Sequence, residues 1–322
     1  MSRSWSASLI VIVALIAALS LLTPLSSLLE LRRTDPDLAL ALIEELRLPR
    51  TLLALGYGAV LGMTGAALQA TFANPLASPD ITGSSSGAAL GAVAGSYWLG
   101  ITGPLALAAC GAAGAALALA ALFAIAGRRS ETATLLLAGI AIALAAGAGT
   151  SLLLALAPSP FAFYDSFEWL MGSFVDRSLP QAAAALIPAA IACGLLASHG
   201  KALDMMALGD DVAGSVGYRP RRLAVDVVAL SAIAVGACVS VCGAIAFVGL
   251  IAPYAARTIT RGHPGQALLP AAAIGAILLL LADLIVRVAP AGRSIPVGVI
   301  TTAIGTPLFI WIVVRMRRTV AS

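Results

Sequence analysis

Charged residues are scarce in this sequence. Only 11% of its 322 residues are Asp, Glu, Lys or Arg, and its mean hydropathy is +1.01, whereas ordinary soluble domains carry about 25% charged residues. Asp80 is the single charged residue from Thr51 to Gly127. A membrane-spanning helix needs about 20 apolar residues, so this interval alone is long enough to cross a bilayer several times. The composition excludes a soluble globular domain and predicts a polytopic membrane protein.

The alternating pattern of β-strands is also absent. Backbone groups in lipid must form hydrogen bonds within the protein, which leaves helices or a closed barrel. The apolar segments are runs of Ala, Leu and Gly without two-residue alternation, and this favours helices. We therefore expect an all-α fold of about ten transmembrane helices, forming a single domain over residues 1–322.

Residues that carry metal or acid–base chemistry are few. The two histidines, His199 and His263, lie in polar connections between apolar segments. All four cysteines lie inside apolar segments, and Cys238 and Cys242, four positions apart, have no His or acid beside them to complete a metal site. We expect the cysteines to be packing residues. The sequence predicts no catalytic residue, no metal and no cofactor bound by this chain.

Nucleotide-binding and nucleophile motifs are missing as well. Gly200-Lys201 is followed by Ala202, so the chain has no P-loop with which to cradle phosphates. GSSSG at 83–87 fits the nucleophile-elbow pattern, but that elbow requires a strand–turn–helix and a triad histidine. We favour serine capping of a membrane helix there over an intramembrane hydrolase that uses Ser85. The net charge of +4 is gathered at segment ends and does not indicate nucleic-acid binding.

The apolar segments define ten expected spans. The connection 158–180 is aromatic and acidic, and we expect a short interfacial helix around Trp169 within it. Ten spans place both termini on the same side of the membrane. The expected spans are 5–29, 51–73, 81–100, 104–127, 132–157, 181–198, 223–243, 250–261, 267–288 and 297–315.

Positive charge is distributed unequally between the two sides of this topology. With the N-terminus inside, twelve of the 19 Lys and Arg residues fall on the cytoplasmic face and seven on the outer face. Cytoplasmic loops carry the excess of Lys and Arg in membrane proteins. We therefore expect both termini and the polar stretch 199–222 to be cytoplasmic.

Small residues recur at two regular spacings. Four glycines of the third span repeat every four positions and would form a smooth stripe that another helix can approach closely. A faint internal repeat has a constant offset of 178 positions, and the two copies run in opposite directions across the membrane, as in many transporters. The stripe is Gly83, Gly87, Gly91 and Gly95; the repeat pairs Gly58, Gly65, Ala66 and Pro75 with Gly236, Gly243, Ala244 and Pro253.

The polar stretch 199–222 contains a short amphipathic pattern. Leu208, Val212 and Val216 are four positions apart and share one face of a helix. Asp210 and Asp211 follow Gly209, where carboxylates suit the first turn of a helix. Gly217 stands where the helix should end. Such a helix can lie on the membrane surface, dock into a groove of a soluble partner, or be a solvated connector.

Three arginines are expected at the outer face, against the general charge bias. Arg47 and Arg50 precede the second span, and Arg287 lies at the outer end of the ninth. Together they could pair with acidic groups of an external partner, or extend individually to lipid headgroups. Asp283 is one helical turn before Arg287, so an ion pair within the helix is expected.

Longer motifs are distributed over nearly the whole chain. They are RLPR (47–50), GAALQATFANPLASPDITGSSSGAALGAV (65–93), LLLAGIA (135–141), WLMGS (169–173), MALG (206–209), FVGLIAP (247–253), LLPAAAIGAILLLLAD (268–283) and PVGVITTAIGTPLFIW (296–311). Together these motifs resemble the FecCD family, the permease subunits of type II ABC importers for vitamin B12, haem and ferric siderophores.

This resemblance implies an assembly in the bacterial inner membrane. It implies a second permease subunit, which is either a copy or a paralogue, two cytoplasmic ATPase subunits that bind ATP and Mg, and a periplasmic binding protein; membrane lipid is the remaining contact. Residues 203–216 would be coupling helices in grooves of the ATPases, and the fifth and tenth helices would line the pathway. The implied coupling residues are Leu208, Gly209, Asp210, Asp211, Val212 and Val216, the docking residues for the binding protein are Arg47, Arg50 and Arg287, and the cytoplasmic gate is Glu131, Thr132, Ala133 and Thr134.

The resemblance is less specific about the cargo. The form SPDITG (78–83) is similar to ferric-siderophore permeases, which favours an iron chelate, with haem and vitamin B12 as alternatives. Tyr254 stands where the family often has His, so no role of that His is transferred. An ion-driven secondary transporter is a more remote alternative, since it would need acids at mid-membrane and the sequence shows none that is well placed.

Overall fold

The computed structural model describes residues 3–127, 132–288 and 295–320, and every regular element within these ranges is a helix. The all-α prediction is confirmed. In chain order the elements are α1 (Arg3–Leu22), α2 (Leu25–Thr34), α3 (Pro36–Ala41), η1 (Leu42–Arg47), α4 (Leu48–Thr71), η2 (Pro79–Thr82), α5 (Ser84–Trp98), α6 (Pro104–Ala126), α7 (Thr132–Ala155), α8 (Pro160–Leu170), α9 (Leu179–Ser198), α10 (Gly200–Met206), α11 (Asp210–Ser215), α12 (Pro220–Cys242), α13 (Val248–Ile259), α14 (Pro264–Val288) and α15 (Val297–Val320).

Nine expected spans correspond to one helix each, and the first, 5–29, covers α1 and the start of α2. The nine helices are α4, α5, α6, α7, α9, α12, α13, α14 and α15. Within the described residues, six are both long and apolar enough to cross a membrane, namely α4 (extended back to Pro36), α6, α7, α9, α12 and α14. By contrast α5, with 15 residues, and α13, with 12 residues, are too short for a full crossing. A break between α-helices precedes each of these two short helices, at residues 72–83 before α5 and 243–247 before α13.

The N-terminal region differs from the expected span 5–29. The helix α1 ends at Leu22, and a new helix begins after Pro24, which lacks the N–H that a continuous helix needs. The following segment, expected as a polar connection, is also helical. Asp35 caps α3 by accepting a hydrogen bond from the Leu38 N–H, so local capping accounts for this helix.

Two helices, α4 and α12, occupy the centre of the bundle. The helix α4 packs against α14, α13, α12 and α9, while α12 packs against α9, α6, α4 and α5. Glycine permits the closest of these contacts, because a Cβ atom on Gly62 would lie 2.0 Å from the carbonyl oxygen of Ala271 in α14. Backbones in membrane helices approach this closely only over small residues.

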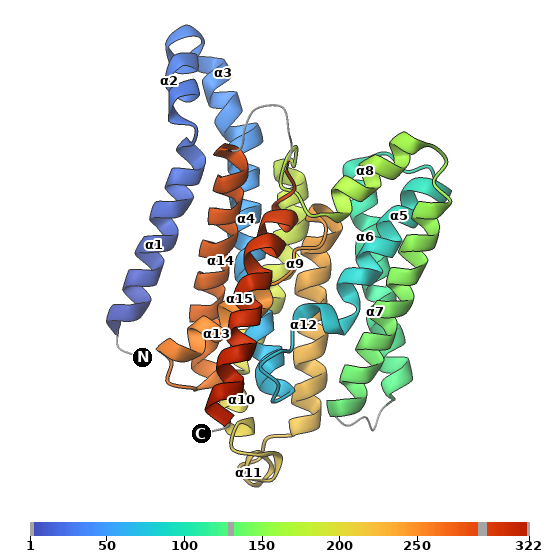
Figure 1. Ribbon diagram of the computed structural model, residues 1–322, viewed down its shortest axis with the longest axis vertical. Coiled ribbons are helices and arrows are strands. Elements are labelled where there is room, and N and C mark those ends of the chain that lie inside the picture. The colour runs from blue at the N-terminus through green and yellow to red at the C-terminus, as the bar shows by residue number, and fades with distance from the viewer. Residues whose placement is uncertain (1–2, 128–131, 289–294, 321–322) are drawn as a thin grey trace.

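The packing around α4 and α12 has the form of an inverted repeat. The helix α4 leads into the short α5 and packs on α14, and α12 leads into the short α13 and packs on α6. The matched glycines fit this relation, since Gly58 faces Gly275 of α14 and Gly236 faces Ala115 of α6. The two central helices run in opposite directions (Figure 1).

The glycine stripe of the third span is used as expected, with one exception. Gly87 and Gly91 face Gly114 of α6, and a Cβ on Gly114 would lie 2.2 Å from the Gly87 carbonyl oxygen. Gly83 instead has a φ of +74° and stands at the start of α5, against α7. The serines that follow do not cap the helix, because Gly83 occupies the capping position and no side-chain capping bond forms.

The remaining helices gather at the two ends of the bundle. Figure 1 shows α2, α3 and α8 at the upper end, and α10 and α11 at the lower end. The start of α1 and the end of α15 also lie at the lower end. The helix expected around Trp169 is present as α8, so the aromatic connection covers the upper end of the bundle.

Candidate functional site

The lower end presents a small turn that carries three exposed apolar side chains. The helix α11 covers only Asp210–Ser215, which is shorter than the pattern from 208 to 216 predicts. Gly209, with a φ of +109°, precedes it, and Gly217, with a φ of +91°, ends it. Leu208, Val212 and Val216 are 63%, 42% and 61% exposed. Apolar side chains held outward in this way are typical of a docking surface.

The two acids of this turn lie where the sequence predicts. Asp210 and Asp211 form the exposed first turn of α11 without a side-chain capping bond. Their negative charges there interact favourably with the positive end of the helix dipole. Ala213, on the opposite side, is fully buried. The turn therefore has one side against the protein and one side open, and the coupling role of its residues remains a prediction.

The helix α10, which leads into this turn, is anchored to the bundle by a hydrogen bond. The Asp204 carboxylate of α10 accepts a hydrogen bond from the Gly265 N–H at 2.8 Å, at the start of α14. Gly200 and Gly265 also lie in close contact, since a Cβ on Gly265 would be 1.9 Å from the Gly200 carbonyl oxygen. Because α14 packs along α4, α10 is connected through α14 to the centre of the bundle.

Two of the three predicted docking arginines pair with one buried acid at the other end of α14, and the third, Arg47, binds the adjoining end of α1. The Nε of Arg50 is 2.8 Å from Oδ1 of Asp283, and the Nε of Arg287 is 2.8 Å from Oδ2 of the same carboxylate. The Asp283 side chain is fully buried. The pair between Asp283 and Arg287 is confirmed, whereas the link to Arg50, from α4, could not be predicted from spacing.

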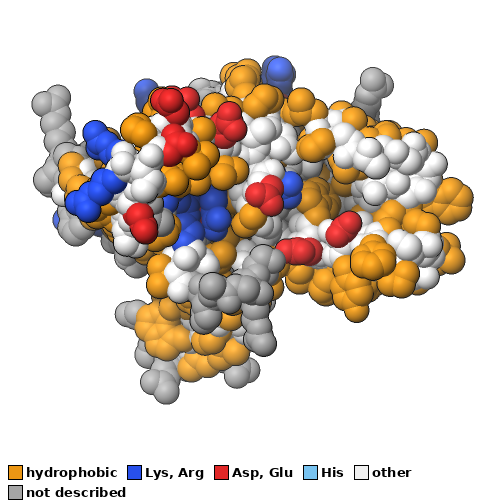
Figure 2. All heavy atoms as spheres, turned by 90° about the horizontal axis from the view of Figure 1, so that it is seen from above, with side chains coloured by type: hydrophobic (Ala, Val, Ile, Leu, Met, Phe, Trp, Pro, Cys, Tyr) orange, Lys and Arg blue, Asp and Glu red, His pale blue; other side chains and the backbone are white. Residues whose placement is uncertain are grey.

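Arg47 and Arg287 also hold α1. Arg47 is 7% exposed and donates to the carbonyl oxygens of Leu21 and Pro24. Arg287 donates to the carbonyl oxygen of Ser20. The alternative in which these side chains extend separately to lipid headgroups does not fit this geometry. Figure 2, which looks onto the upper end, shows a basic patch flanked by acidic and apolar side chains.

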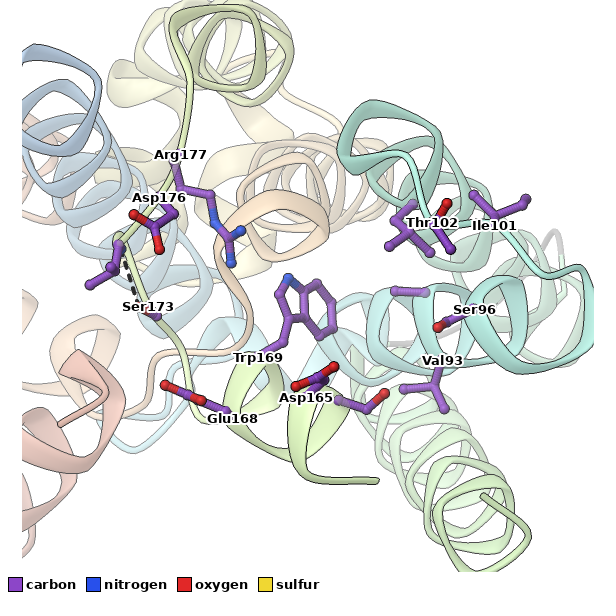
Figure 3. Close-up of a pocket in the computed structure, with 14 residues that line it drawn as sticks. Val93, Ser96, Ile101, Thr102, Asp165, Glu168, Trp169, Ser173, Asp176 and Arg177 are labelled. Atoms are coloured by element: carbon purple, nitrogen blue, oxygen red, sulfur yellow. Dashed lines mark hydrogen bonds between the residues drawn. The ribbon is translucent and has the colours of Figure 1, made fainter. Parts of the chain in front are cut away.

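The upper end also contains a cavity that the sequence did not reveal. Its volume is about 490 Å³, and it lies between α8, the upper part of α5 and the segment before α9. Figure 3 shows Asp165, Glu168 and Trp169 entering from α8, with Arg177 reaching in from the opposite side. The acids and the tryptophan were visible in the sequence, but only packing brings them opposite Arg177.

The predicted gate residues lie at the lower end of α7. Thr132, Ala133 and Thr134 form its first turn, and Glu131 lies outside the described residues. Within those residues no group of three His, Cys, Asp or Glu side chains is placed to hold a metal ion. The gate remains a prediction.

Comparison with known proteins decides the family. The FecCD transport family matches residues 6–315. The chain belongs to this family. It is accordingly the permease of an ABC importer, a multi-pass membrane protein that is not itself an enzyme.

Individual relatives agree with this assignment. The chain is 36% identical over 280 residues to the vitamin B12 import system permease protein BtuC of Citrobacter koseri, covering 85% of this chain and 83% of the relative. It is 36% identical over 281 residues to the BtuC protein of Salmonella schwarzengrund, covering 85% and 84%. A solved structure described as an inward-facing, metal-chelate type ABC transporter matches with a TM-score of 0.83 and 29% identity, covering 95% of this chain and 97% of that one. The predicted resemblance and permease fold are confirmed.

Proposed function

We propose that this chain is the membrane subunit of an importer that moves an iron chelate, such as a ferric siderophore, from the periplasm to the cytoplasm. The main support is the match over 95% of the chain to a transporter of the metal-chelate type. The SPDITG form of residues 78–83, similar to ferric-siderophore permeases, points the same way.

The proposed assembly has a second permease subunit, two ATPase subunits and a periplasmic binding protein. The lower end of the bundle faces the cytoplasm in this arrangement, with both termini on that side of the inner membrane. The distribution of Lys and Arg supports this orientation. So does the position of the exposed turn at residues 208–216, which lies at the same end as the start of α1 and the end of α15.

Movement of the ATPases reaches the bundle through α10, α11 and α14 in this proposal. Leu208, Val212 and Val216 supply the apolar contacts to an ATPase groove. Asp204 passes the displacement to Gly265 and hence to α14. Transport then requires that ATP binding stabilises one of two arrangements of the helices over the other. The first turn of α7, with Thr132 and Thr134, is the cytoplasmic gate, as the family resemblance implies.

The upper end receives the binding protein. Arg47, Arg50 and Arg287 form a site whose net charge is positive even after Asp283 is counted, because Arg50 and Arg287 share the one carboxylate and Arg47 adds a further positive charge. Acidic groups on the binding protein would complete this cluster. Asp283 holds two of the arginines in place before the partner arrives.

Vitamin B12 is the second candidate cargo. The relatives that are 36% identical are named for vitamin B12 import, and the family profile does not separate the two cargoes. A permease contributes less to cargo choice than its binding protein does, so relatedness of the permease favours the transport mechanism more strongly than the cargo.

Uptake by the complete importer tests both the proposed cargo and the proposed ATP-driven mechanism. Permease, ATPases and binding protein are reconstituted in proteoliposomes, and uptake of a radiolabelled ferric siderophore is compared with uptake of radiolabelled vitamin B12, with and without ATP. ATP-dependent uptake of the siderophore is the expected result. Uptake of vitamin B12 alone would overturn the cargo assignment, and uptake that is independent of ATP and driven by an ion gradient would overturn the mechanism.

A further inference from the structure

Asp80 is an exposed acid in an unexpected place. It belongs to η2, the short turn in the segment that joins α4 to α5. Its side chain is exposed, whereas Pro79 and Thr82 in the same turn are buried. It is also the only charged residue between Thr51 and Gly127, so no charged neighbour in the sequence accompanies it.

The turn lies deep within the membrane-spanning part of the bundle. A Cβ on Gly139 in α7 would be 2.0 Å from the Ile81 carbonyl oxygen, and a Cβ on Gly83 would touch Ile142. At a rise of 1.5 Å per residue, Gly139 and Ile142 lie about 10–15 Å along α7 from its lower end. The hydrocarbon layer is about 30 Å thick. Figure 1 shows the segment between α4 and α5 turning beside the middle of α12.

A carboxylate at this depth needs a polar surrounding. Placing a charged Asp against lipid at the centre of a membrane costs about 2.5–3.5 kcal/mol or more. In the part of the chain that the structure describes, no ion pair includes Asp80. Beside it are the hydroxyls of Ser78 and Ser85, and the Ser85 Oγ is buried without a hydrogen-bond partner among the described residues. The exposed side of Asp80 therefore faces water or protein rather than lipid.

The surrounding helices indicate which compartment the exposed side of Asp80 faces. On one side η2 contacts α7, and on the other Pro79 lies against Gly249 of α13. The helix α13 in turn meets α15, and the ring of Phe247, just before α13, lies tilted against that of Phe309 with centroids 6.1 Å apart. Asp80 thus lies in a turn beside α7, the fifth span, and the same turn contacts α13, which packs on α15, the tenth span.

We propose that Asp80 faces the aqueous translocation pathway and is its acidic contact for passing cargo. The inference rests on the proposed importer function and adds a selectivity to it. A carboxylate in a confined site of low dielectric attracts cations and repels anions. The pathway would favour cargo that carries positive charge or hydrogen-bond donors at its surface, and it would disfavour cargo with a negative surface.

Charged thiol reagents can measure this directly. The complete importer is placed in membrane vesicles, with the four native cysteines replaced and Ser78→Cys introduced beside Asp80. Reaction rates are compared for a cationic and an anionic membrane-impermeant methanethiosulfonate, with and without ATP. The cationic reagent is expected to be favoured by about tenfold relative to its preference for a free thiol. Asp80→Asn should abolish this preference, and Asp80→Glu should retain it.

A lipid-facing position supplies the matched control. Leu117, in α6, is 70% exposed on an apolar surface, and Leu117→Cys should react with a membrane-permeant maleimide but with neither impermeant reagent. Ile81→Cys serves as a second reporter if Ser78→Cys does not assemble. Failure of both reporters to react with impermeant reagents, with or without ATP, would overturn the proposal. A preference that survives Asp80→Asn would do so as well. ATP-dependent uptake by the cysteine-free parent is measured separately, so that a failure of the importer function appears there and not in the labelling.

Discussion

Arg50 and Asp283 stand 233 positions apart in the sequence and are joined by an Nε–Oδ1 contact of 2.8 Å. The same carboxylate holds Arg287, so one buried acid connects α4 to α14 at the upper end of the bundle. At the other end, α14 begins beside Asp204 of α10. A single helix therefore joins the surface proposed for the binding protein to the surface proposed for the ATPases.

Removal of the Asp283 charge should destabilise the protein. Asp283→Asn leaves Arg50 and Arg287 without their counter-ion in a buried site, which typically costs about 3–5 kcal/mol. Thermal unfolding in detergent should show a clear decrease in Tm. The control is Asp37→Asn, an exposed acid near the same end, which should change Tm little. Equal effects of the two variants would contradict the role of Asp283 as an internal counter-ion.

Charge reversal at the arginines should weaken docking of the binding protein. Arg50→Glu is expected to lower the affinity of the permease complex by about tenfold to a hundredfold, with the loss greatest at low salt. Affinity is measured by surface plasmon resonance over a range of ionic strengths. Arg33→Glu, which reverses an exposed charge on α2, separates a local effect from a general one. An affinity that Arg50→Glu leaves unchanged at low salt would reject the docking role, provided that Tm shows the variant to be folded.

The apolar turn should be needed for transport rather than for folding. Leu208→Asp places a charge on a side chain that is 63% exposed, so the permease should fold normally while its contact with the ATPase weakens. Uptake is expected to fall by about tenfold, the effect of losing an interface residue worth a little over 1 kcal/mol. Gly214→Ala, whose added methyl group meets nothing within 4 Å, is the control in the adjoining helix α11. Normal uptake with Leu208→Asp would count against the coupling surface.

Asp204 offers a test of the connection to α14. Asp204→Ala removes the acceptor of the Gly265 N–H, and the lost bond should cost about 1–2 kcal/mol. We expect fewer cargo molecules transported per ATP hydrolysed, measured in proteoliposomes, with binding of the ATPases largely retained. Asp204→Asn keeps a carbonyl oxygen able to accept the bond and should be nearly normal. An unchanged ratio for Asp204→Ala would show that movement passes to the bundle elsewhere.

The close approach of α4 and α14 predicts a steric effect. In Gly62→Ala the new Cβ would lie 2.0 Å from the Ala271 carbonyl oxygen, and overpacking of this kind typically costs about 1–3 kcal/mol. Gly194→Ala in α9 adds the same methyl group where no atom lies within 4 Å and should be neutral or slightly stabilising. Comparison of the Tm values of the two variants separates the steric cost of close packing from the effect of alanine on helix propensity.

The sequence by itself determined the membrane helices of this protein. Hydropathy along the chain is a local property, so nine of the ten expected spans reappear as one helix each, including the short one that became α13. Local pattern also predicted the turn around Asp210, the helix at Trp169, and the stripe at Gly87 and Gly91. The first span was extended past Pro24 to residue 29, and that boundary was wrong because α1 ends at Leu22.

Tertiary structure decided which of these elements meet. Spacing indicated the pair between Asp283 and Arg287, but the approach of Arg50 depends on α4 packing along α14. Similarly, the sequence places Asp80 in a connection between two spans. In the structure, its turn lies deep in the bundle beside α7. Helix formation follows from neighbouring residues, whereas charge pairing and depth in the membrane depend on how distant helices pack, and that information is not carried by any single segment.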